Sequence, residues 1–277
     1  LNSKNSLSDQ GNELSGKNLI VFFEKKSTRT RLSFDIAIKQ LGGSSTILNK
    51  EDIHLANQKE NIGDTIKTFS LYADGLILRV DDHNTLSEAA KYSDVPIINA
   101  LSNISHPCQC MAGLMTLIEE KKSLNNLNIL WIGPITNVAN SWIDAFNMDL
   151  GFSFNIFCPE KLSEKYINKM KDYKINPKID CSGILHGEIN KQLLENADVI
   201  MTDTWHSMGD DTNIDDLKTL KEFRVTNKIM SYAKSDCIFM HCLPANRNEE
   251  VDGEDDGINV VCLFSRKLYS KAKTPFV

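Results

Sequence analysis

Hydroxyl and guanidinium side chains gather in the segment Ser27–Arg31, which reads Ser-Thr-Arg-Thr-Arg. The segment follows the apolar run Leu19–Phe23 and opens a stretch of helical periodicity that starts near Thr28. A helix start offers unpaired N–H groups and partial positive charge, and an arginine offers a planar fork of donors for phosphate. This density of donors favours an anion site over a simple helix cap. Because neither GxxxxGK[ST] nor GxGxxG occurs, nucleotide binding through those loops is not supported.

Two further polar groups stand where apolar elements end or begin. Arg79 closes the strand-like run Gly75–Val80, and its charge needs a partner, either a ligand or an acidic side chain on a neighbouring helix. His106 and Gln109 lie three residues apart at the start of a long helical stretch, so they share one helix face. A helix start disfavours the charged form of His106. The neutral imidazole could polarise a carbonyl group, although helix capping is the simpler alternative.

The second half of the chain carries two more candidate segments after apolar runs. Asp203 follows the run Asp198–Thr202 and could pair with a ligand ammonium, or it could belong to an ordinary loop. His241 and Cys242 follow the run Cys237–Met240 and suggest a thiol nucleophile or a metal site. Neighbouring His and Cys side chains do not easily face one ion, and no third group that would orient a nucleophile is evident. No metal site is therefore predicted.

Short apolar runs alternate with helical stretches along the whole chain, which predicts parallel sheets covered by helices. We expect an α/β protein with two doubly wound domains, each a parallel sheet flanked by helices, divided into residues 1–122 and 123–277. Ligands bind beyond the carboxyl ends of such strands, where the segments above lie. The ranges that carry the expectation are the strands Leu19–Phe23, Gly75–Val80, Pro96–Ile98, Leu127–Ile132, Phe152–Phe157, Ile179–Cys181, Asp198–Thr202 and Cys237–Met240, and the helices Thr28–Leu41, Ile62–Tyr72, Thr85–Tyr92, His106–Lys122, Asn137–Asn147, Glu160–Tyr173, Glu188–Asn196, Ile214–Phe223 and Asn227–Ala233.

Composition limits the classes of function. The chain has 277 residues with 37 acidic and 31 basic side chains, and its net charge of -6 argues against general nucleic-acid binding. No apolar run approaches the ~18 residues of a membrane-spanning helix. Seven cysteines without a CxxC pair suggest reduced thiols and a cytoplasmic location. The acidic segment Glu249–Asp256 is expected to be a solvated loop.

The order and spacing of these segments resemble the aspartate/ornithine carbamoyltransferase family over nearly the whole chain. Ser27–Arg31 is similar to the family's carbamoyl phosphate loop, and His106–Gln109 is similar to its second signature. Asp203 with Ser207–Gly209, together with His241–Pro244, resembles the ornithine branch. The resemblance implies transfer of the carbamoyl group of carbamoyl phosphate to the δ-amine of L-ornithine, which gives L-citrulline and phosphate in arginine metabolism.

The resemblance also implies a role for each matching residue. The phosphate would be held by Ser27, Thr28, Arg29 and Thr30. The carbonyl oxygen would be bound by Arg79, His106 and Thr30, where charge grows in the transition state. Gln109 would bind the carbamoyl amide. The α-amino acid end of ornithine would be held by Asn137, Asp203, Ser207 and Met208.

The remaining implied roles concern the reacting amine and the neighbouring subunit. Cys242 and the backbone of Leu243 would face the δ-amine, with the thiol orienting it and forming no covalent bond. Arg266 resembles a late arginine of the family that faces the carbamoyl group. The family forms homotrimers, so His54 in the loop Asp52–Leu55 would reach a neighbour's site. No metal and no organic cofactor is implied, because carbamoyl phosphate is already activated.

Two alternatives remain open at this point. The chain could carbamoylate another amine, such as putrescine or an N-acylated ornithine, although Asp203 and Ser207–Gly209 fit an α-amino acid better. It could also be a non-catalytic paralogue that binds carbamoyl phosphate or a partner, although the full set of motifs speaks against such loss.

Overall fold

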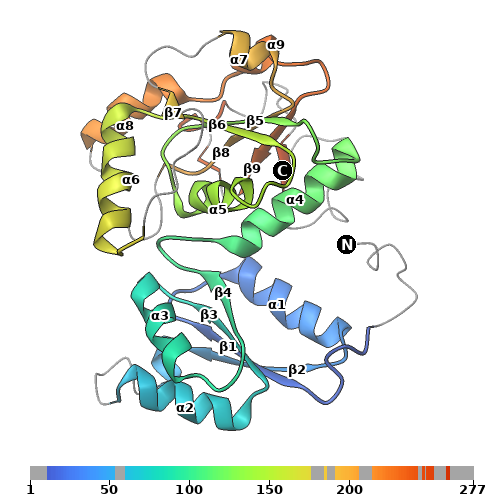
Figure 1. The fold of residues 1–277 in the computed structure, drawn as a ribbon, viewed down its shortest axis with the longest axis vertical. Helices are drawn as coiled ribbons and strands as arrows, with labels where there is room; N and C mark the ends of the chain where they lie inside the picture. Colours follow the sequence, from blue (N-terminus) through green and yellow to red (C-terminus); the bar gives the residue numbers. More distant parts are fainter. Residues whose placement is uncertain are drawn as a thin grey trace. The chain divides into compact units, whose positions relative to one another are not determined.

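The structure is a computed structural model that describes residues 11–53, 60–175, 184–185, 191–205, 214–242, 245–246, 248–252 and 260–262. The chain forms two compact units, Leu1–Cys108 and Gln109–Val277, each built around a parallel sheet with helices, which confirms the predicted fold class (Figure 1). In the described part of the chain, no helix is both long and apolar enough to cross a membrane.

The first unit has a four-stranded sheet in the order β2-β1-β3-β4. All three strand pairs are parallel. Because β1 lies between β2 and β3, the chain leaves it in one direction through α1 and returns on its other side through α2. The elements are β1 (Asn18–Phe23), α1 (Thr28–Gln40), β2 (Ser44–Asn49), a 3-10 turn at Lys50–Asp52, α2 (Ile62–Tyr72), β3 (Gly75–Arg79), α3 (His83–Tyr92) and β4 (Ile97–Leu101).

Strand β1 is buried on both sides, as its continuous apolar run predicts. Ile20 and Phe22 face a core that includes α2 and α3, with Phe69 and Leu86 among its members. The alternate residues of β1 pack instead with Ile38 of α1. The helices therefore cover the two faces of this sheet separately, and both cores hold the carboxyl ends of β1 and β3 in place.

The second unit has a six-stranded sheet in the order β10-β9-β8-β5-β6-β7, also parallel throughout. Its centre is the pair β5 and β8, from which the chain extends outward in opposite directions. The elements are α4 (Pro107–Lys121), β5 (Asn128–Ile132), α5 (Asn137–Phe146), β6 (Ser153–Phe157), α6 (Glu160–Asp172), β7 (Ile184–Leu185), α7 (Lys191–Glu195), β8 (Val199–Thr202), α8 (Ile214–Leu220), a 3-10 turn at Lys221–Phe223, α9 (Asn227–Tyr232), β9 (Ile238–His241) and β10 (Val260–Cys262).

Large aromatic side chains fill the core of the second unit. Trp131 of β5 and Trp142 of α5 are fully buried, and the Trp142 ring stacks on Phe154 with ring centroids 6.1 Å apart. A Cβ atom at Gly113 of α4 would lie 2.5 Å from the Trp142 ring, so only glycine lets the two helices approach this closely.

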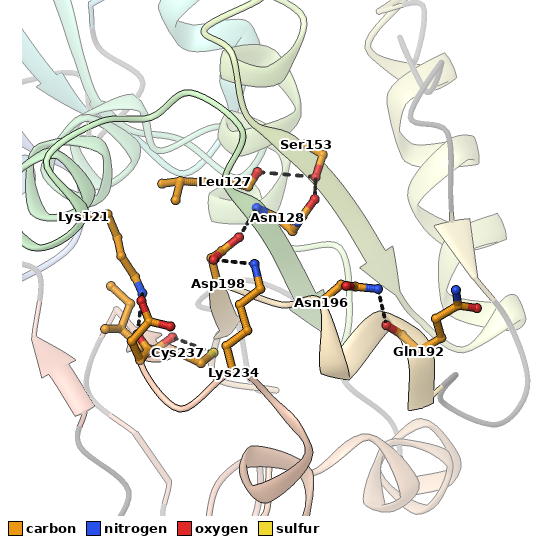
Figure 2. Close-up of polar contacts among 11 residues, drawn as sticks. Lys121, Leu127, Asn128, Ser153, Gln192, Asn196, Asp198, Lys234 and Cys237 are labelled. Atoms are coloured by element: carbon orange, nitrogen blue, oxygen red, sulfur yellow. Dashed lines mark hydrogen bonds and ion pairs between the residues drawn. The ribbon is translucent and has the colours of Figure 1, made fainter.

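Hydrogen bonds and an ion pair lie at the amino ends of the strands of the second unit (Figure 2). The Asp198 carboxylate accepts from the Asn128 backbone N–H at 2.9 Å and from Lys234 Nζ at 2.7 Å. Ser153 Oγ donates to Asn128 Oδ1 at 2.8 Å, and Lys121 forms an ion pair with Asp236 at 2.9 Å. These bonds lie at the edge opposite the carboxyl ends, so they hold the sheet without occupying its ligand-binding edge.

Some sequence expectations differ from the structure. The prediction that Glu249–Asp256 is a solvated loop is wrong at Glu250 and Val251, which are buried, because Val251 bridges to Val225 and brings Glu250 inside. The predicted strand Ile179–Cys181 lies outside the described residues. Strand β10 was not expected, and β4 extends to Leu101 beyond the predicted Pro96–Ile98.

Candidate active site

Both sheets reverse their direction of winding at one point, and ligands of open α/β sheets bind at such points. In the first unit this point lies between β1 and β3, whose residues Phe23 and Arg79 are register partners. The segment Ser27–Arg31 follows β1, so it and Arg79 reach the same edge. In the second unit the point lies between β5 and β8, and the segments after these strands carry Thr136 and Asp203.

The start of α1 is open toward a ligand. Ser27 is the N-cap residue with extended backbone, yet its hydroxyl makes no capping hydrogen bond. Thr28 and Arg29 are exposed, while Thr30 is buried. The arrangement fits an anion site, because helix N–H groups and side-chain donors converge at one end.

Arg79 lies against this helix start and is only 5% exposed. Its Nη1 donates to Thr30 Oγ1 at 3.0 Å, and its Nε has no hydrogen-bond partner among the described residues. Burial lowers the pKa of Arg79, with Asp81 opposing and Arg29 adding to the shift. A buried guanidinium with a donor to spare suits an anionic ligand.

Glu24, to which the sequence analysis gave no role, braces the strand end that carries Arg79. Its backbone N–H donates to the Arg79 carbonyl at 2.9 Å, and its carboxylate accepts from the Asp81 backbone N–H at 2.7 Å. Lys50 Nζ donates to the same carboxylate at 3.2 Å. Three strand ends therefore meet at Glu24, a convergence that depends on sheet order and that sequence spacing does not reveal.

His106 and Gln109 are both buried at the beginning of α4, with exposed fractions of 7% and 1%. Burial lowers the pKa of His106 to about 3, and the positive charge of Arg79 adds to the shift. The imidazole is therefore neutral near pH 7, and in this form it keeps one N–H that can polarise a carbonyl oxygen. Gln109 Nε2 has no hydrogen-bond partner within the described part of the chain, so it too can serve a ligand.

In the second unit, Asp203 joins the two central strand ends. Its Oδ2 accepts from Thr136 Oγ1 at 2.8 Å, and its Oδ1 accepts from the Thr204 backbone N–H at 2.8 Å. Thr136 also caps α5, accepting from the Ala139 N–H at 3.4 Å. Position 136 carries a typical N-cap residue before a predicted helix, but its bond to Asp203 was missed. Asn137 directly follows this cap and is half-buried.

Cys242 makes the third contact of the Asp203 carboxylate, since its Sγ donates to Asp203 Oδ1. Burial, followed by the negative charge of Asp203 and this hydrogen bond, raises the pKa of the Cys242 thiol well above its ordinary value. The thiol is therefore protonated near pH 7, which disfavours a role as nucleophile. His241 points elsewhere, toward Glu250, so the two neighbours do not converge on one metal ion. Among the described residues, no cluster of three His, Cys, Asp or Glu side chains is placed to hold a metal.

The structure thus brings together Thr30 with Arg79, and Asp203 with Cys242, within their respective units. Five further predicted residues lie outside the described part of the chain: His54, Ser207, Met208, Leu243 and Arg266.

Family patterns match nearly all of the chain in two parts. Residues 1–119 match the carbamoyl-P binding domain of aspartate/ornithine carbamoyltransferases, and residues 125–258 match the Asp/Orn binding domain. The chain belongs to the aspartate/ornithine carbamoyltransferase family. The carbamoyltransferase match in the first part covers Ser27–Arg31, Arg79 and His106, and the match in the second covers Asp203 and Cys242.

Individual members of the carbamoyltransferase family agree with this assignment. An ornithine carbamoyltransferase of Methanocaldococcus jannaschii is 43% identical over 249 residues, which cover 87% of this chain and 80% of that protein. The solved ornithine carbamoyltransferase of Pyrococcus furiosus is 36% identical with a TM-score of 0.80, covering 94% of this chain and 83% of that one. An anabolic ornithine carbamoyltransferase from Campylobacter jejuni is 33% identical with a TM-score of 0.75, covering 91% and 82%.

Proposed function

We propose that this chain transfers the carbamoyl group of carbamoyl phosphate to the δ-amine of L-ornithine. The amine nitrogen bonds to the carbonyl carbon, and the bond from that carbon to the phosphate oxygen breaks. The proton lost from the amine leaves with phosphate, and L-citrulline is released. Family membership supports the carbamoyl transfer, and the relatives named ornithine carbamoyltransferase support ornithine as the acceptor.

The observation that carries the proposal is the buried pair of Arg79 and Thr30 at the start of α1. The guanidinium is buried, it donates a hydrogen bond to Thr30, and burial outweighs the opposing charge of Asp81, so a dianionic substrate would add the negative charge that this site favours. Ser27, Thr28 and Arg29 complete the donors around the phosphate. We infer that Arg266 faces the carbamoyl group and that His54 reaches the carbamoyl phosphate from a neighbouring subunit.

Charge stabilisation explains the rate. As the amine attacks, negative charge grows on the carbonyl oxygen, where Arg79, His106 and Thr30 donate hydrogen bonds. A neutral imidazole keeps one N–H, which is the donor that this role needs. Gln109 holds the carbamoyl amide, so the carbonyl carbon is presented in one orientation. No metal or organic cofactor takes part in these steps.

Asp203 and Cys242 are assigned to ornithine. The carboxylate of Asp203 faces the α-ammonium, with Asn137, Ser207 and Met208 at the same end of the substrate. The Cys242 thiol stays protonated and donates its S–H to Asp203, so a sulfur lone pair remains to accept a hydrogen bond from the δ-amine. The Leu243 carbonyl accepts a second hydrogen bond from the same amine. This arrangement desolvates and orients the amine without a covalent intermediate.

We also propose the larger organisation of the protein. Residues 1–122 form the carbamoyl phosphate-binding domain and residues 123–277 the ornithine-binding domain, supported by family matches that end at 119 and resume at 125. The chain acts as a cytoplasmic homotrimer within arginine metabolism. Light scattering after size exclusion tests the assembly: a mass of three chains is expected, and a monomer at assay concentration would contradict it.

A parallel assay of several amines tests the proposed reaction. The purified chain is incubated with carbamoyl phosphate and, separately, ornithine, putrescine, N-acetylornithine or aspartate. We expect a carbamoylated product with ornithine alone. Product from another amine without citrulline would favour a different acceptor. Phosphate release with no product from any amine, at the rate of spontaneous hydrolysis, would favour a non-catalytic paralogue.

A further inference from the structure

A closed circuit of contacts lies behind the Cys242 thiol in the second unit. It starts at the Cys242–Asp203 hydrogen bond and returns to Cys242 through its chain neighbour. Every link is a covalent neighbour or a polar contact between described residues. The members, in order, are Cys242, Asp203, Thr204, Asn246, Glu250 and His241.

Glu250 is the charged member of the circuit that has no place in the proposed reaction. Its exposed fraction is 0%, and that of His241 is 1%. One oxygen, Oε1, accepts from the Asn246 backbone N–H and lies 3.5 Å from His241 Nε2. Burying a carboxylate costs free energy that hydrogen-bonding and charged partners must offset. The position of Glu250 is therefore not that of a side chain that serves only to be hydrated at the surface.

Glu250 Oε1 therefore contacts residues on both sides of Cys242 in the sequence: it accepts a hydrogen bond from the Asn246 backbone N–H, and it lies 3.5 Å from His241 Nε2. His241 is the last residue of β9 and directly precedes the thiol, while Asn246 lies four residues beyond it. The hydrogen bond to Asn246 and the close approach to His241 both favour one position of the Cys242 backbone next to β8.

Asn246 extends the same brace to β8. Its side-chain Nδ2 donates to Thr204 Oγ1 at 3.1 Å, and the Thr204 backbone N–H donates to Asp203 Oδ1 at 2.8 Å. That Asp203 oxygen is the one that accepts from Cys242. The carboxylate and thiol are thus held against each other from both ends.

We propose that Glu250 is a positioning residue that sets the Cys242 thiol against Asp203 for the amine acceptor, an inference that rests on the proposed function. Glu250 does not touch substrate itself. It acts through His241 and Asn246, so its removal should weaken acceptor binding and leave the carbamoyl phosphate side unaffected.

The first test separates the two substrates. Glu250→Gln keeps the size of the side chain and removes its charge, and the exposed neighbour Glu249→Gln is the matched control. We expect KM for ornithine to rise about tenfold in E250Q with KM for carbamoyl phosphate within twofold of the wild type. E249Q should leave both within twofold. Loss of folded protein alone would lower kcat with both KM values unchanged, which would overturn the positioning role.

The second test needs no turnover. Alkylation of Cys242 by iodoacetamide, followed by peptide mass spectrometry, reports how firmly the thiol is held to Asp203. We expect alkylation several-fold faster in E250Q than in the wild type and E249Q. If the wild type makes no citrulline but this change appears, the proposed function fails and the positioning role stands. If citrulline forms and E250Q changes neither KM nor alkylation, the positioning role fails alone.

Thr204→Val gives a second test that can be used if Glu250→Gln does not fold. Valine keeps the shape of threonine and removes the acceptor of Asn246 Nδ2, so the brace is cut at a second point. We expect KM for ornithine to rise about threefold and Cys242 alkylation to accelerate, with KM for carbamoyl phosphate unchanged. Wild-type values for all three quantities in T204V would overturn the circuit.

Discussion

Arg79 Nη1 donates a hydrogen bond of 3.0 Å to Thr30 Oγ1 across 49 residues of sequence. The bond is a product of parallel pairing, because β1 and β3 end side by side with Phe23 opposite Arg79. In the proposed reaction, the bond joins two of the groups that meet the carbonyl oxygen of carbamoyl phosphate.

Arg79→Ala should lower kcat for citrulline formation by about 10²–10³-fold, since one preorganised donor to the transition-state oxygen is lost. Arg79→Lys keeps the positive charge but loses the planar pair of donors, so its kcat should lie between those of the wild type and Arg79→Ala. Initial rates measure the effect, and circular dichroism checks the fold. Unchanged turnover in folded Arg79→Ala would remove Arg79 from the site.

His106 should make the protein less stable as the pH falls. Because burial lowers its pKa from 6.5 to about 3, the unfolded chain binds this proton first. The contribution is absent above about pH 6.5 and grows by up to about 1.4 kcal/mol per pH unit below it. Urea unfolding at several pH values between 5 and 7 should show a shallower loss in His106→Gln. Equal slopes in the two proteins would show that His106 is already protonated in the fold.

Two threonine caps allow a matched comparison. Thr226 caps α9, accepting from the Ile229 N–H at 3.2 Å, and Thr226→Val should cost about 1 kcal/mol of unfolding free energy. Thr136→Val loses a similar cap and also a donor to buried Asp203, so about 2–3 kcal/mol is expected. Denaturant unfolding followed by tryptophan fluorescence measures both. Equal costs would mean that the Asp203 bond contributes nothing.

Cys242 should resist alkylation near pH 8, because its raised pKa leaves little thiolate. Asp203→Asn removes the charge that helps to raise this pKa, so the thiolate fraction and the alkylation rate should increase. Rates over a pH series, with peptide mapping, give the apparent pKa of the thiol. A rate in the wild type equal to that of a small free thiol would show that the Asp203 contact is not kept in solution.

Local patterns in the sequence predict much of this fold. Helix α2 has the predicted bounds Ile62–Tyr72, and β1 begins one residue before the predicted run. The reason is that apolar runs and helical periodicity are local properties. The prediction of an anion site at Ser27–Arg31 rests on a local pattern in the same sense, since donors, strand and helix start are contiguous.

Contacts between distant segments could not be predicted in this way. Thr136 lies 67 residues from Asp203, and only the pairing of β5 with β8 brings them together. Glu250 looked like part of a solvated acidic run, because its neighbours are charged and its partners, His241 and Asn246, do not form a recognisable pattern. Burial of a charge depends on the partners that the sheet supplies.

The chain has three tryptophans, Trp131, Trp142 and Trp205, and all of them are buried in the second unit. Intrinsic tryptophan fluorescence therefore reports on the second unit and not on the first. An unfolding curve recorded by this fluorescence measures the unfolding of the sheet around β5 and β8. It does not detect the loss of the hydrogen bond between Arg79 and Thr30 in the first unit. A probe of the first unit, such as a tryptophan introduced there or hydrogen exchange, would show whether the two units melt as one.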